Sequence, residues 1–311
     1  MARRTGAGPE AMLAEHESAE RTGPGGIAAE REPGEAPPVA TYGGASASGR
    51  TLAPPVRRGL SLVASAQREG EKAMAITRTV HIHEGPGGPF ESMVVGDAAA
   101  GVQPGMLLFP NFFGTKEWDF AKAEALAALG YQVLVVDYYG QGKRGHDMES
   151  SGHLLHDFMA DRAAVKRRLL DALAELRALP GVDPERCGAI GFCAGGKCVL
   201  DLARAGGAIK AGVSFHGVYD APPFPNAVIT AKLLICDGWN DQLCPPEAKL
   251  ALCRELTEAG ADWQFISYGD TGHAFTADNT PMNAERTFGF QPETNRRSWK
   301  AMTDFLAETL T

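Results

Sequence analysis

The sequence lacks the features that mark membrane-spanning, secreted and nucleic-acid-binding proteins. No apolar run approaches the roughly 18 residues that a membrane span needs, and no apolar stretch follows Arg3 and Arg4 as it would in a secretory signal peptide. Basic residues are not in excess, because 30 lysines and arginines stand against 38 acids and leave a net charge of −8. A surface that reads phosphates needs a basic excess. We therefore expect a cytoplasmic protein that binds neither membranes nor nucleic acids.

The six cysteines lack the spacing of a metal or redox site. They stand at positions 187, 193, 198, 236, 244 and 253, and no two of them form a C-x-x-C pair. Several fall within apolar runs, so a reducing compartment with mostly buried thiols fits better than a disulfide framework. We interpret Cys187, Cys198, Cys236 and Cys253 as small core side chains, and Cys193 as the exception.

The first 73 residues contain a single aromatic residue, Tyr42, and no sustained hydrophobic periodicity. Nine basic side chains balance nine acidic ones in this segment. Its composition cannot bury enough apolar surface to offset the entropy of ordering. A mitochondrial presequence is the alternative, although such presequences avoid acids. We predict that residues 1–73 are a disordered N-terminal extension and that residues 74–311 form a single folded domain.

Strand and helix patterns alternate from residue 75 onward. An antiparallel pair of strands is expected at 76–83 and 90–96, joined by a Gly-rich turn at 85–88. Further strands are predicted at 105–110, 132–136, 186–191, 210–216, 231–236 and 263–268, and helices at 116–129, 154–178, 194–205, 245–259 and 294–309. Continuous apolar strands separated by helices predict a mostly parallel central sheet with helices on both faces. Functional groups in such α/β sheets lie at the carboxyl ends of the strands.

The segment at 187–196 predicts a strand, a tight turn and the start of a helix. Its centre, residues 191–195, reads Gly-Phe-Cys-Ala-Gly, which is the nucleophile-elbow pattern with cysteine in place of serine. The central residue of an elbow has a strained backbone, and the glycines on either side prevent collisions across the turn. The helix N-terminus behind Cys193 favours its thiolate. Taken alone, the motif leaves open a buried cysteine on a phosphate-type loop.

An acid and a histidine follow the cysteine in the chain order that this elbow requires. Asp241 lies in the loop after the predicted strand 231–236, and Asp237, at the end of that strand, is its competitor. His273 lies in a later loop, bracketed by small residues. We predict that His273 takes the proton of the Cys193 thiol and that Asp241 orients the imidazole.

Further site residues follow from their positions near these strand ends. The predicted oxyanion hole combines the backbone N–H groups of Ala194 and Phe112. For His216, a structural role in which hydrogen bonds hold the ring is the alternative to a role in the site. The candidates for the substrate pocket are Asn111, Tyr138, Arg162 and His216.

Four segments together resemble the dienelactone hydrolase family, compact α/β-hydrolases with a cysteine nucleophile. They are residues 130–140, 191–196, 238–241 and 272–275, within a resemblance that runs from 76 to 309. The resemblance implies one α/β-hydrolase catalytic domain without a large lid, over residues 74–311. It also implies hydrolysis of small carboxylic esters or lactones through an acyl-enzyme intermediate, with no metal and no organic cofactor. We expect the chain to act as a monomer or a homodimer.

Two positions depart from the dienelactone-specific members of this family. Those members carry a glutamate where this chain has Asn111, and an arginine where it has Ala277. Asparagine cannot accept a proton as the glutamate does. Without the arginine, an anionic lactone would lose an ion pair worth on the order of 2–5 kcal/mol. Arg162, Lys116 or Arg144 could supply the cation instead.

Three other functions stay open at this point. A non-catalytic relative with a binding role is disfavoured because the set of cysteine, histidine and aspartate is complete. A thiol redox pair of Cys193 and Cys198 is disfavoured because a spacing of five across a helix start places the thiols on roughly opposite sides. A thioesterase or another acyl hydrolase on the same fold is the third alternative.

Overall fold

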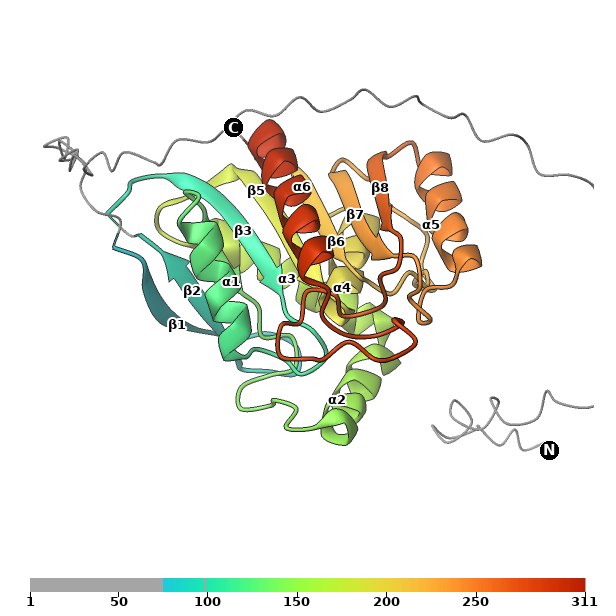
Figure 1. The fold of residues 1–311 in the computed structure, drawn as a ribbon. Coiled ribbons are helices and arrows are strands. Elements are labelled where there is room, and N and C mark those ends of the chain that lie inside the picture. The colour runs from blue at the N-terminus through green and yellow to red at the C-terminus, as the bar shows by residue number, and fades with distance from the viewer. Residues whose placement is uncertain (1–74, 98, 311) are drawn as a thin grey trace, which may run out of the picture. The chain divides into compact units, whose positions relative to one another are not determined.

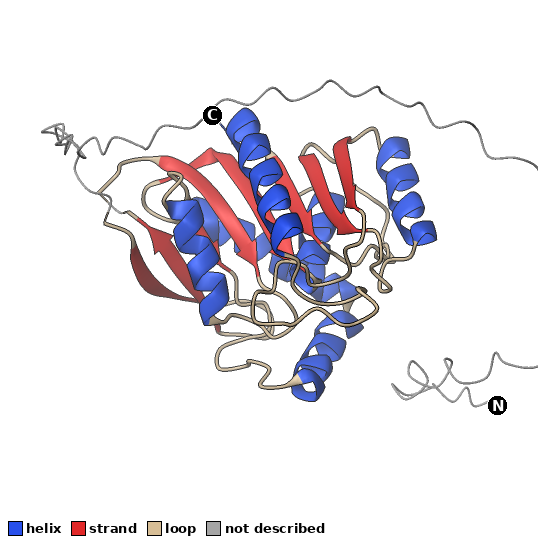
Figure 2. Ribbon diagram, in the orientation of Figure 1, coloured by secondary structure: helices blue, strands red, loops and turns tan. Residues whose placement is uncertain are grey.

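The computed structural model describes residues 75–97 and 99–310 (Figure 1). The predictions for residues 1–73 lie outside the described residues. The described chain forms an eight-stranded sheet with helices on both faces (Figure 2). The strands are β1 (Thr77–His83), β2 (Phe90–Gly96), β3 (Gln103–Phe109), β4 (Gln132–Val135), β5 (Val182–Phe192), β6 (Ala211–Phe215), β7 (Lys232–Gly238) and β8 (Asp262–Tyr268).

The strands lie in the order β1-β2-β4-β3-β5-β6-β7-β8. β1 and β2 pair antiparallel, as predicted, and β2 pairs antiparallel with β4. Every pairing from β4 to β8 is parallel. The carboxyl ends of the parallel strands therefore meet at one edge of the sheet, and this is the edge where the predicted site residues follow β3, β5, β7 and β8.

Two hydrophobic layers hold the helices against the sheet. On one face, α1 (Glu117–Ala127) and α6 (Pro292–Leu310) pack on the side chains of Leu108, Ile190 and Leu234. On the other face lie α2 (Met148–Ala160), α3 (Arg162–Ala178), α4 (Ala194–Arg204) and α5 (Pro246–Glu258). Because both faces are covered, the central strands are continuously apolar and do not alternate. The predicted α/β-hydrolase architecture is confirmed.

The single helix predicted at 154–178 is wrong. The chain forms two helices there, and α2 begins at Met148, six positions before the predicted start. Asp161 separates them with non-helical backbone angles of φ −115° and ψ 88°. Its carboxylate accepts hydrogen bonds from the backbone N–H groups of Ala163 and Ala164, at 3.0 and 2.9 Å. This side-chain acceptor stabilises a new helix start, while the hydrophobic pattern continues across the break and does not reveal it.

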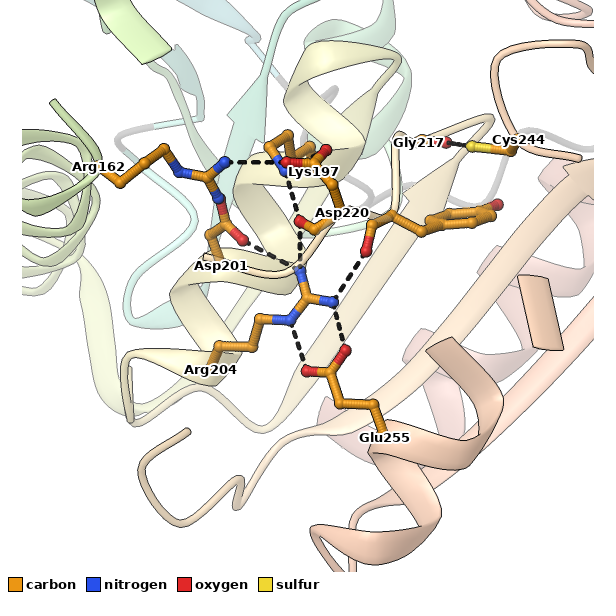
Figure 3. Close-up of polar contacts among 9 residues, drawn as sticks. Arg162, Lys197, Asp201, Arg204, Gly217, Asp220, Cys244 and Glu255 are labelled. Carbon is orange, nitrogen blue, oxygen red and sulfur yellow. Dashed lines mark hydrogen bonds and ion pairs between the residues drawn. The ribbon is translucent and has the colours of Figure 1, made fainter. Parts of the chain in front are cut away.

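A network of buried charges joins α4 to the neighbouring elements (Figure 3). The guanidinium of Arg204 is 1% exposed and donates two hydrogen bonds to Glu255 of α5, at 2.8 and 2.7 Å. It also donates to Asp201, one turn earlier on α4, and to the carbonyl of Tyr219. Its cation thus neutralises carboxylates on two helices that contact the same face of the sheet.

The same network continues to the start of α3. Arg162 donates to Asp201 at 2.5 Å and to Asp220 at 3.1 Å. The Lys197 ammonium lies 2.7 Å from the Asp220 carboxylate, and the backbone N–H of Lys197 donates to the carbonyl of Cys193. Burial lowers the pKa of Lys197 and raises that of Asp201, so the opposite charges beside them are needed to keep both groups ionised. The network therefore fixes the helix that follows Cys193.

We expect Arg204→Met to lower the free energy of unfolding by about 3–5 kcal/mol, because it leaves Asp201 buried without this cation. Urea unfolding followed by circular dichroism measures the change. Arg296→Met is the matched control, since Arg296 pairs with Glu293 on the exposed surface of α6. The control should unfold at the wild-type urea concentration. An Arg204→Met variant as stable as the control would contradict this role of the network.

Candidate active site

Cys193 occupies the tight turn between β5 and α4. Its backbone has φ 56° and ψ −116°, a conformation that non-glycine residues rarely adopt. A Cβ atom on Gly191 would collide with the backbone of Gly195, and one on Gly195 would collide with the carbonyl oxygens of Phe109 and Pro110. Both positions therefore require glycine, and the G-x-C-x-G spacing follows from the geometry of the turn. The structure forms the predicted elbow.

Asp241 and His273 come together at the same edge of the sheet. The Oδ2 atom of Asp241 lies 2.7 Å from Nδ1 of His273, and both side chains are buried. Asp241 lies in the turn after β7, where its N–H donates to the carbonyl of Gly238. The backbone of His273 is held by Thr287 and Gly289, through hydrogen bonds of 2.8 and 2.9 Å. The ring is thus fixed by its carboxylate partner and by its own main chain.

The second nitrogen of this imidazole, Nε2, has no hydrogen-bond partner in the described part of the chain and could give or take a proton. The Nε2 atom of His273 is buried and makes no hydrogen bond to any residue that the structure describes. Burial lowers the pKa of His273, but the thiolate charge of Cys193 and the hydrogen bond to Asp241 outweigh it and raise the pKa to about 10. The pKa of His273 therefore depends on the charge of Cys193 as well as on Asp241.

The two backbone groups predicted for the oxyanion hole also lie at this edge. Among the described residues, neither the N–H of Phe112 nor that of Ala194 has a hydrogen-bond acceptor. Ala194 is the first residue of α4, where N–H groups have no partner within the helix. The hydroxyl of Tyr139 donates to the carbonyl of Phe112 at 2.9 Å and holds the loop after β3. Both N–H groups are available to a negatively charged oxygen.

Of the other sequence-predicted residues, His216 contacts His273, whereas Arg162 pairs with carboxylates beside α4. His216 contacts His273 edge to face, with ring centroids 5.0 Å apart, and its Nε2 lies 2.8 Å from the hydroxyl oxygen of Thr276. Burial, and the charge of His273 next, lower the pKa of His216, so it faces its neighbour as a neutral ring. Arg162 is held in the ion network beside α4, where a bound anion would compete with Asp201 and Asp220.

The two remaining candidates contact each other, with Asn111 in the loop after β3 and Tyr138 in the segment after β4. The side-chain oxygen of Asn111 accepts from the N–H of Phe113 at 3.0 Å, so the amide is oriented within its own turn. Tyr138 is buried, and its hydroxyl lies 2.5 Å from the carbonyl of Asn111 and 3.0 Å from that of Pro110. The hydroxyl of Tyr138 therefore holds the backbone of the loop after β3 in place.

Asp237, the competitor for the acid, has another partner. Its carboxylate lies 2.6 Å from the ammonium of Lys249 and accepts a hydrogen bond from the hydroxyl of Tyr219. Burial raises the pKa of Asp237 to about 6, against the effect of Lys249. The contact with His273 is made by Asp241.

The remaining cysteines are free thiols, and Cys253 is less buried than predicted. Cys187, Cys198 and Cys236 are buried as predicted, whereas Cys253 is half-buried on α5. Burial raises the thiol pKa of each of these four and of Cys244. They are therefore poor nucleophiles at neutral pH.

Sequence reasoning missed the loop between His273 and α6. Phe288 stacks on the imidazole of His273 with ring centroids 5.8 Å apart, yet its side chain is 38% exposed. The side-chain oxygen of Asn283 accepts hydrogen bonds from the N–H groups of Thr287 and Phe288 and so holds this segment in place. The segment has no hydrophobic periodicity, and Asn283 four residues before Thr287 was the one available sign of a local turn.

The described chain has the α/β-hydrolase fold. A solved α/β hydrolase from a deep-sea metagenome, MGS-M1, superposes with a TM-score of 0.56 at 17% identity, over 76% of this chain and 99% of that one. Residues 90–310 match the dienelactone hydrolase family, and the chain belongs to that family. No helix in the described residues is long and apolar enough to cross a membrane.

Several individual proteins are also similar to this chain. The solved structure m3DLH is 33% identical with a TM-score of 0.72, and a dienelactone hydrolase-like promiscuous phosphotriesterase, P91, from metagenomic libraries is 30% identical with a TM-score of 0.71. Each alignment covers 76% of this chain and 100% of the other. A Yersinia pestis protein named "Putative carboxymethylenebutenolidase" is 25% identical over 68% of this chain and 80% of its own. An uncharacterised Caenorhabditis elegans protein is 35% identical over 46% of this chain and 93% of its own.

We expect the imidazole of His273 to lose its proton near pH 10, well above its ordinary value of 6.5. Removing the thiolate with Cys193→Ala should lower this pKa, because burial then opposes the charged ring with less compensation. Asp241→Asn should lower it as well, since the amide does not carry the negative charge. NMR titration of isotope-labelled histidine measures all three proteins. A pKa near 6.5 in the wild type, or one unchanged in Cys193→Ala, would contradict the coupling.

Proposed function

We propose that the chain hydrolyses small carboxylic esters or lactones through Cys193, His273 and Asp241. The observation that carries this proposal is the imidazole of His273, which is bound to Asp241 on one side and has its free nitrogen near the thiol at the elbow. Membership of the dienelactone hydrolase family supports a hydrolase. The family fold also supports a site that opens directly at the carboxyl edge of the sheet.

The reaction proceeds in two halves. The Cys193 thiolate attacks the carbonyl carbon, and the N–H groups of Phe112 and Ala194 stabilise the oxygen that becomes negative. The tetrahedral intermediate collapses to a thioester on Cys193, and protonated His273 gives its proton to the leaving alkoxide. Neutral His273 then takes a proton from water, which attacks the thioester and releases the acid. Asp241 keeps the imidazole in the required tautomer and stabilises its charged form.

The substrate that fits best carries no negative charge near the reacting carbonyl. Ala277 lies in a turn four residues after His273, where its N–H donates to the carbonyl of Ala274 and its methyl group provides no cation. Two of the cations considered as replacements are engaged within the protein. Arg144 lies 3.2 Å from the carboxylate of Asp137, and Arg162 is held by two aspartates. We therefore propose a preference for neutral esters and lactones.

The first test removes the nucleophile. Cys193→Ala should lower kcat/KM for an activated neutral ester by roughly 10³-fold or more, as is usual for the loss of a nucleophile. Cys253→Ala is the matched control, because it removes the other half-buried thiol and should keep the wild-type rate. In the wild type, iodoacetamide should label Cys193 before the five thiols whose pKa is raised by burial. An active Cys193→Ala protein with a native circular dichroism spectrum would end the proposal.

The second test concerns charge preference. We expect wild-type kcat/KM to be higher for a neutral lactone than for an anionic dienelactone. The double variant Asn111→Glu and Ala277→Arg should shift this ratio toward the anionic lactone, because it restores a proton acceptor and a cation. The gain should fall within about 30–5,000-fold, since an ion pair in a partly buried site contributes on the order of 2–5 kcal/mol. A thioester and an activated phosphotriester in the same assay identify other acyl or phosphoryl chemistry.

A wild-type enzyme that already prefers the anionic lactone would contradict the charge argument and indicate another cation. The single variants then separate the two effects. Ala277→Arg acts on the binding of the carboxylate and should change KM, whereas Asn111→Glu acts on the thiol and should change kcat.

A further inference from the structure

Two histidines of the edge strand β1 and one glutamate of α3 form a cluster away from the elbow. His81 and His83 lie two residues apart and therefore on the same face of β1. Glu175, near the end of α3, reaches the same place: its Oε2 lies 2.9 Å from Nε2 of His81. One ligand atom from each of the three residues lies within 4.8 Å of the others. We propose that they bind a divalent transition-metal ion, with Zn²⁺ as the representative.

The geometry of the three side chains suits such an ion. The two imidazole rings stack at 5.6 Å with an interplanar angle of 26°, so both extend in the same direction from the strand. A tetrahedral zinc site has metal–ligand distances of about 2.0–2.2 Å. Its ligand atoms are then roughly 3.3 Å apart, which is within the spread of this cluster.

His83 provides a second, independent indication of a ligand. Its Nδ1 atom is buried and has no hydrogen-bond partner in the part of the chain that the structure describes. A buried polar atom without a partner is unfavourable, and a bound ion or an ion-bound water would satisfy the ring.

The surroundings supply charge and room for a fourth ligand. Asp171 lies one turn before Glu175 on α3, and it lines a cavity of about 10 Å³ together with His83, Asp137 and the guanidinium of Arg168. A cavity of this size holds about one water molecule. Two imidazoles, one carboxylate and a water form a donor set that zinc accepts. The Glu175 carboxylate offsets part of the charge of the ion.

The cluster is separate from the proposed catalytic residues. Four strand spacings separate β1 from β5 in the sheet order. At about 4.8 Å per strand this is roughly 19 Å. The proposed ion would join the edge strand to α3 and would bind the folded chain alone, so it should stabilise the folded state by an amount that rises with the logarithm of its concentration above Kd.

The test measures Zn²⁺ binding to the full chain by titration calorimetry. It uses Cys193→Ala as the parent protein, because a thiolate beside His273 could also bind the ion. We expect one saturable site. His81→Ala, His83→Ala and Glu175→Gln should each weaken it by at least about 10-fold. His153→Ala is the matched control, since this exposed histidine lies beside Glu149 on α2 without a third ligand, and it should bind as the parent does.

Two further measurements identify the ligands and separate this proposal from the proposed function. Co²⁺ in place of Zn²⁺ should give visible bands of nitrogen and oxygen ligation and no thiolate charge-transfer band. The melting temperature should rise with Zn²⁺ in the parent and stay constant in His83→Ala. Ester hydrolysis by His83→Ala with Cys193 intact should equal the wild-type rate. Absence of saturable binding to the parent, unchanged affinity in His83→Ala, or a cobalt–thiolate band would overturn the proposal.

Discussion

The backbone conformation of Cys193 is the constraint on which the site depends. A residue with φ 56° between a strand and a helix presents its side chain at the top of the turn, and this is possible only because Gly191 and Gly195 have no Cβ. The same turn leaves the N–H of Ala194 at the first position of α4 without an acceptor. The proposed nucleophile and the proposed oxyanion donor therefore arise from one local geometry, which must be held in place by the surrounding protein.

Buried charge on one side of the elbow and apolar packing on the other provide that support. Arg204, Asp201 and Arg162 connect α4 to α5 and α3 at considerable desolvation cost, so the removal of one partner is more damaging than the net contribution of the network suggests. On the opposite face, Phe192 stacks on Phe215 at 4.9 Å. A strained turn persists when its neighbours are fixed in this way.

The site and the edge cluster on β1 differ in how they use histidine. His273 is buried beside Cys193 and Asp241, and their negative charge raises its pKa against the effect of burial. His216 is buried without such compensation, and burial lowers its pKa, whereas at His83 the charge of Glu175 opposes the effect of burial. A charged imidazole suits proton transfer to a leaving group, and a neutral one suits packing against another ring or binding to a metal. Identical side chains thus acquire separate chemistry from their environment.

The sequence by itself determined the order of elements, the elbow and the loops that hold Asp241 and His273, because these depend on local spacing and on glycine at fixed positions. The stacking of Phe288 on His273 and the pairing of Arg162 were decided by the tertiary structure, and the break at Asp161 by a local side-chain cap. Each depends on residues far apart in the chain or on a side chain competing with a continuous helical pattern. Hydrophobic periodicity reports which face is buried, and it contains no information on which polar groups meet there.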